Sequence, residues 1–80
     1  MLERFFVGDQ IDSIGEWIQK RRNGLGLTRR QLAQQVGCSA ATIKKVERDE
    51  RRPSFQIAQL LAQQLKIPAP EQDAFIRRAR

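Results

Sequence analysis

The side chains of this sequence that could do chemistry are its arginines and lysines, which gather in the middle of the chain. Residues 20–52 contain ten basic and three acidic side chains, a net charge of +7, while the rest of the chain carries −1. The basic residues of this segment are Lys20, Arg21, Arg22, Arg29, Arg30, Lys44, Lys45, Arg48, Arg51 and Arg52. Concentrated positive charge is typical of a surface that binds a polyanion. We favour a nucleic acid as that polyanion, and the alternative is a solvated face that serves solubility.

The chain contains few residues of the types that catalysis and metal binding require. The 80 residues include no histidine, no tyrosine and one cysteine. This composition excludes disulfides within the chain, zinc sites of the Cys/His kind and histidine-based acid–base catalysis. The sequence also lacks a glycine-rich phosphate loop and a nucleophile–base pair. We therefore expect no enzyme, no metal and no other cofactor.

The elements that must position the basic residues are predicted to be helices. Residues that cap a helix or suit its first turn recur along the chain: Ser13, Thr28, Ser39, Ser54 and Pro70. Gly24 and Gly37 are expected to end the first two helices. No segment alternates with the period of a strand, so the chain is predicted to be an all-α domain of five helices. The side chains expected inside are Ile14, Trp17, Ile18, Leu32, Ala33, Val36, Ile43, Val46, Ile57, Leu60, Leu61, Leu65, Ala74, Phe75 and Ile76.

The second and third predicted helices are joined by only Gly37 and Cys38. So short a connection makes two helices cross sharply, as in a helix-turn-helix, and does not let them run antiparallel. Ala33 is small enough for the third helix to approach the second closely, and Gly37 can take the positive φ that the turn requires. We therefore expect a helix-turn-helix at this point.

A specific pattern extends from the second helix to the fourth. Residues 27–39 read LTRRQLAQQVGCS and are followed by Thr42-Ile43, Val46-Glu47 and Arg51-Arg52-Pro53-Ser54. This pattern, over about Ile14 to Ile67, strongly resembles the lambda-repressor-like (Xre/Cro) family of DNA-binding transcription regulators. The resemblance implies a compact five-helix domain whose third helix (about Ser39 to Arg48) enters the DNA major groove. We expect this domain at residues 12–80, after an N-terminal arm or extension at 1–11. The sequence departs from the family at Arg29, where glutamine is common.

Helix geometry predicts which face of the third helix reads the bases. If Ile43 and Val46 point inward, the outward side chains are Ala40, Ala41, Lys44, Lys45 and Arg48. The two alanines can contact thymine methyl groups and the two lysines can donate to guanine, although helix propensity alone would also account for the alanines. Direct readout is sparse, so we expect DNA shape or a partner domain to supply part of the specificity.

Phosphate contacts are expected around this reading face. Arg29 and Gln31 stand at the start of the second helix, where free backbone amides and the helix dipole attract phosphate. The full set of expected phosphate-binding residues is Arg29, Gln31, Ser39, Thr42, Arg48, Arg51 and Arg52. Ser39 also caps its own helix, and Thr42 can turn back toward that helix instead. Such contacts fix the register on DNA without reading its sequence.

Four further residues are expected to support the fold. The family resemblance implies that Arg22 and Glu47 form a partly buried pair that pins the third helix, and the alternative is two solvated charges. Cys38 is expected to be a small core residue at the turn, with a redox-sensing thiol as the alternative. Trp17 is expected to anchor the first helix in the core.

These observations predict a sequence-specific transcription regulator, such as a repressor, that binds double-stranded DNA. We expect it as a homodimer on half-sites ~34–36 Å apart, or as the N-terminal reader of a larger regulator with a C-terminal effector domain. No apolar run has the length of a membrane span, and we expect a cytoplasmic protein, nucleoid-associated when bound. The alternative function is a protein-interaction or antitoxin-type module that uses an apolar patch of Phe5, Phe6, Phe75 and Ile76.

Overall fold

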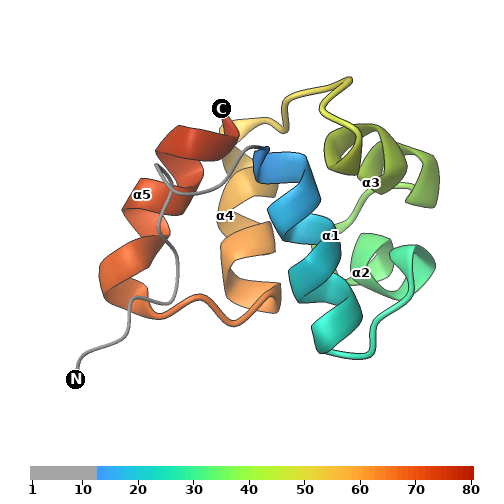
Figure 1. The fold of residues 1–80 in the computed structure, drawn as a ribbon, viewed down its shortest axis with the longest axis horizontal. Helices are drawn as coiled ribbons and strands as arrows, with labels where there is room; N and C mark the ends of the chain where they lie inside the picture. Colours follow the sequence, from blue (N-terminus) through green and yellow to red (C-terminus); the bar gives the residue numbers. More distant parts are fainter. Residues whose placement is uncertain (1–12) are drawn as a thin grey trace.

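In a computed structural model, residues 13–80 are described, and they form five α-helices without a strand among them. The helices are α1 (Ile14–Gly24), α2 (Arg29–Val36), α3 (Ala40–Glu47), α4 (Phe55–Gln64) and α5 (Ala69–Ala79). Figure 1 shows α1 and α4 between α5 on one side and the α2–α3 pair on the other. The all-α class is confirmed. The predicted N-terminal arm, residues 1–11, lies outside the described residues.

Hydroxyl side chains cap four of the five helices, as predicted. Each accepts a hydrogen bond from the backbone N–H three residues later, over 3.0–3.2 Å. The capping residues are Ser13, Thr28, Ser39 and Ser54. At α2 the Gln31 side chain accepts the Thr28 N–H at 2.9 Å, which completes the predicted capping box. At α1 only the Ser13 half of the box is present, and the Glu16 carboxylate lies 3.7 Å from the Lys20 ammonium.

Two helix boundaries differ from the prediction. Gly24 is still helical, and the left-handed turn after α1 falls at Gly26, with φ 73°. This position of the turn brings Leu25 and Leu27 against the core. At α5 the helix begins one residue before Pro70, which occupies its second position. A proline fits there because the first amides of a helix need no intrahelical acceptor.

One apolar core receives side chains from all five helices. Ile18, Leu32, Ile43, Leu61 and Phe75 come from α1 to α5 in turn, and each is 0% exposed. Burying such a side chain stabilises the fold by ~1.5–3 kcal/mol. The ring of half-buried Trp17 packs on that of Phe75 with 5.8 Å between centroids, so Trp17 holds α1 to α5 as expected.

The buried face of α4 differs from the predicted stripe. Ile57 and Leu60 are only half-buried, whereas Ala58, Leu61 and Ala62 face the core. The physical reason is close packing, because α4 contacts both α2 and α5 and its two buried alanines leave room for that approach.

The apolar patch predicted for a protein-interaction module is wrong for its two α5 members. Phe75 and Ile76 are 0% and 8% exposed, because α5 turns this face toward α4 and α1 to close the core. They are therefore unavailable to a partner. Phe5 and Phe6, the other two members, lie outside the described residues.

Candidate nucleic-acid interface

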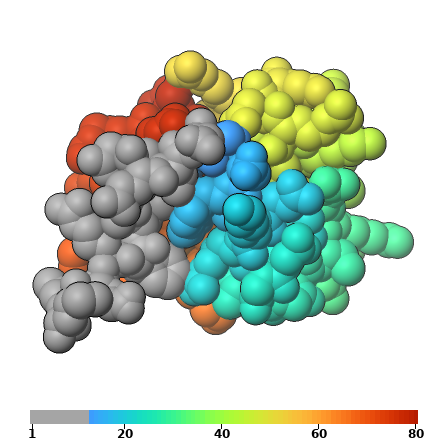
Figure 2. Space-filling model, viewed as in Figure 1, coloured from blue at the N-terminus to red at the C-terminus, as the bar shows by residue number. Residues whose placement is uncertain are grey.

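The turn between α2 and α3 has the local geometry predicted for it. Gly37 ends α2 with φ 77° and ψ 35°, a left-handed conformation that costs most other residues ~1–2 kcal/mol. The Cys38 N–H then donates to the Ala33 carbonyl at 2.9 Å, and Ser39 caps α3. Ala33, the small residue expected to allow the close approach of α3, is 2% exposed, and α2 and α3 are in contact. In the space-filling view, α2 and α3 together form one side of the molecule, opposite α5 (Figure 2).

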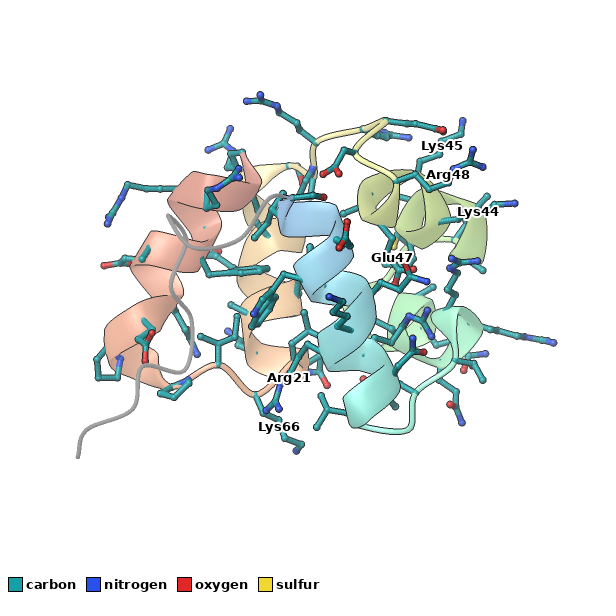
Figure 3. The ribbon with its side chains drawn as sticks, viewed as in Figure 1. Arg21, Lys44, Lys45, Glu47, Arg48 and Lys66 are labelled. Atoms are coloured by element: carbon teal, nitrogen blue, oxygen red, sulfur yellow. The ribbon has the colours of Figure 1, made fainter. Side chains whose placement is uncertain are left out.

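α3 has one face in the core and one face in solvent. Ile43, Val46 and Glu47 are buried. The exposed residues of the helix and its C-cap are Ala40, Ala41, Lys44, Lys45 and Arg48, the set expected from helix geometry. Figure 3 shows the three cationic side chains extending away from the rest of the fold. The outer face of α3, as we call these five residues, contains no carboxylate, although Arg48 makes an exposed 3.2 Å pair with Glu50.

The small polar residues proposed to contact phosphate are engaged in helix caps. The Gln31 Oε1 accepts the Thr28 N–H, and this cap does not use the amide nitrogen, which is the only donor of the side chain. The hydroxyls of Ser39 and Thr42 lie 3.0 Å apart. Thr42 is therefore turned back toward the start of its own helix, the alternative weighed for it. These residues lie at the starts of α2 and α3, where the first backbone amides have no intrahelical acceptor.

Arg51 and Arg52 lie exposed in the loop between α3 and α4. Together with Arg78 of α5 they line a pocket between the start of α1 and the end of α5. The Arg52 Nη1 donates to the Arg80 carbonyl at 2.5 Å. The basic surface thus continues past the end of α3 onto α5.

Glu47 is the centre of a buried ionic network. Arg22 binds its carboxylate through Nε at 2.6 Å and Nη2 at 3.3 Å, and the Arg22 Nη1 donates to the Leu27 carbonyl at 2.8 Å. Arg22 and Glu47 are 7% and 4% exposed, so the structure contains the pair that the resemblance implied. Arg29 adds a contact that the sequence reasoning missed, from its Nε to the Glu47 Oε1 at 2.8 Å. One feature of the sequence pointed to this contact: no acidic residue lies between Glu16 and Glu47.

A second acidic residue, Asp49, lies just after α3, and the sequence reasoning missed its contacts with the start of α1. Its carboxylate accepts the Gly15 N–H at 3.1 Å and the Ser13 hydroxyl, so it stabilises the positive end of α1. A Cβ on Gly15 would lie 2.5 Å from the backbone carbonyls of Val46 and Glu47. Asp49 has φ 59°, a left-handed conformation that aspartate tolerates. A glycine in the first turn of α1 was the signal of this close approach.

Cys38 is half-buried against the core. Burial raises the pKa of its thiol above the usual 9.0, and the positive charge of Arg51 offsets this only in part. At neutral pH the thiolate is therefore scarce, which favours the expected packing role over redox sensing.

The family model described as Helix-turn-helix matches residues 18–72, more than half of the sequence. No curated protein and no solved structure gave a match. Within residues 13–80, no group of three potential metal ligands occurs, and no helix has both the length and the apolar composition that crossing a bilayer demands.

Proposed function

Because the chain belongs to the helix-turn-helix family of DNA-binding regulators, we propose that it recognises a specific duplex sequence through the outer face of α3 and thereby controls transcription. The observation that carries this proposal is the division of α3 into a buried and a free face. Ile43 and Val46 fix the helix to the core, while three cations and two methyl side chains are left in solvent without a carboxylate among them. Such a helix can enter the major groove of DNA.

The outer face of α3 offers two kinds of base contact. Ala40 and Ala41 form the first turn, the part of a recognition helix that contacts base edges, and their methyl groups suit thymine methyls. Lys44 and Lys45 follow one turn later and can donate to guanine O6 and N7. With so few hydrogen-bonding side chains, sequence-dependent DNA shape supplies the rest of the specificity in this proposal.

Phosphate contacts in this proposal surround the outer face. The start of α2 contributes Arg29 and Gln31, the start of α3 contributes Ser39, and the end of α3 contributes Arg48. Arg51 and Arg52 extend the contacts along the adjoining loop. Because these groups bind the backbone, they set the register of α3 without distinguishing bases.

A single α3 of eight residues covers only a few base pairs. We therefore propose that two copies bind half-sites one helical turn apart, ~34–36 Å between centres. Selection of bound duplexes from a random pool tests this arrangement directly. A repeated motif at that spacing supports the dimer, and a single short motif contradicts it.

The decisive experiment compares charge reversal on and away from the outer face of α3. Lys45→Glu should lower the preference for the selected duplex over a scrambled one roughly fivefold or more, since a good base contact contributes ~1–3 kcal/mol of discrimination. Lys66→Glu is the matched control, because it makes the same charge change at an exposed site that Figure 3 shows far from Lys45. Equal preference in the two variants, or a wild type that binds every duplex alike, would contradict the proposal.

A further inference from the structure

We propose that Glu47 orients Arg29 for a phosphate of the DNA backbone, so that one buried carboxylate fixes both α3 and the phosphate contact at the start of α2. This inference rests on the proposed function and assigns to Glu47 a positioning role beyond its pairing with Arg22. The role proposed for Arg29 differs from that of an ordinary phosphate contact, because Arg29 is already bound to Glu47 in the absence of DNA.

Arg29 is not needed to neutralise Glu47. The Glu47 side chain is 0% exposed and already receives two hydrogen bonds from Arg22, whose third bond goes to the Leu27 carbonyl. One arginine therefore balances the buried carboxylate. Arg29 brings a second positive charge to the same site, which leaves the three-residue cluster with a net charge of +1.

The Arg29 guanidinium is held at one edge and open at the other. Its Nε is bound to Glu47 at 2.8 Å, while the side chain as a whole remains 35% exposed. No acceptor among residues 13–80 bonds to its two terminal nitrogens. Because the guanidinium is planar and rigid, fixing Nε also fixes the direction of these donors. Among residues 13–80 the carboxylate bonded to Arg29 is that of Glu47, and a phosphate is an acceptor that suits the remaining donors of the planar guanidinium.

A lysine at position 29 could not make both contacts. Its single ammonium can supply charge, but it has no rigid fork with which to bind Glu47 along one edge and a phosphate along the other. The Glu47 contact also removes much of the rotational freedom that an exposed arginine would lose on binding. The proposal therefore predicts that charge alone at position 29 is insufficient.

The test measures duplex affinity against salt concentration for the wild type, Arg29→Lys, Arg29→Gln and the control Arg30→Lys. Arg30 is the exposed neighbour, so its replacement by lysine should leave affinity within about twofold, as expected for a screened surface charge. Arg29→Lys should weaken binding roughly tenfold while keeping most of the salt dependence. Arg29→Gln should weaken it further and reduce the slope of log K against log salt by about 0.9. Arg22 still pairs with Glu47 in these variants, so the fold should persist, which thermal unfolding checks.

If Arg29→Lys binds as tightly as the wild type, Glu47 does not orient Arg29. The inference then fails, while the proposed function stands. If Arg29→Gln lowers only the melting temperature and leaves the salt slope unchanged, Arg29 is structural and the inference also fails. A wild type that binds no duplex overturns the proposed function together with the inference. The NMR signal of the Arg29 Nε–H gives a further check, because it should persist when DNA binds, and its loss would mean that Arg29 leaves Glu47.

Discussion

Replacing Glu47 by alanine should destabilise the domain by ~3–5 kcal/mol, because it leaves the buried charge of Arg22 without a partner. Arg22 is 7% exposed and meets the carboxylate at 2.6 and 3.3 Å. Arg29 would lose its 2.8 Å contact as well, but its side chain is 35% exposed and water can solvate it. The cost of the substitution therefore falls mainly on Arg22.

This loss is a large fraction of the stability available to an 80-residue chain. Domains of this kind are stable by ~5–15 kcal/mol, and each 1 kcal/mol moves the melting temperature by ~4–8 °C. The melting temperature of Glu47→Ala should therefore fall by at least ~12 °C. Thermal and urea unfolding followed by circular dichroism would measure the change, and the midpoint should move without a change in the urea slope.

Two variants show whether the loss arises from the buried pair. Glu50→Ala breaks the exposed pair with Arg48, whose side chains are 49% and 58% exposed, and should cost only ~0–1 kcal/mol. The double variant Arg22→Met, Glu47→Leu should recover most of the lost stability, since no unpaired charge is left in the core. An unchanged melting temperature in Glu47→Ala, or a loss no larger than that of Glu50→Ala, would refute the reasoning.

Two other predictions concern the contact of α1 with α3 and the thiol at the turn. Gly15→Ala should destabilise the fold by ~1–3 kcal/mol, because its Cβ would lie 2.5 Å from two backbone carbonyls. Gly24→Ala, whose Cβ meets nothing within 4 Å, should be neutral or stabilising by up to about 1 kcal/mol, and equal unfolding midpoints would contradict this contrast. Alkylation of Cys38 should be slow at neutral pH and still accelerate above pH 9.0, since burial raises its pKa and only the thiolate reacts; a rate already constant at neutral pH would show that the thiol is not protected.

The end of α3 is held to the rest of the domain by two carboxylates. Glu47 ties it to Arg22 on α1 and to Arg29 on α2, and Asp49 ties it to the first turn of α1. The start of α3 is held differently, by the Gly37 turn and the Ser39 cap. The helix that carries the proposed reading face is therefore fixed at both ends, which limits its movement relative to α1 and α2.

One long-range contact, between Arg22 and Glu47, was predicted from the family resemblance, because helix patterns do not specify it. The Helix-turn-helix match confirms that resemblance, and the Arg22–Glu47 pair is present. The same resemblance gave no account of Arg29, because this chain departs from the family there. Its ion pair with Glu47 became visible only when α1, α2 and α3 were placed together.

The local features of this protein were determined by its sequence. Capping residues placed the helix starts within a residue or so, Gly37 identified the turn, and helical spacing identified the exposed side of α3. These features depend on neighbours within about one helical turn, which a linear pattern records. Tertiary structure alone decided the partners of Arg29 and Asp49, which bond to residues 18 to 36 positions away. Such contacts depend on how whole helices pack against one another, and the spacing of residues within each helix leaves that packing open.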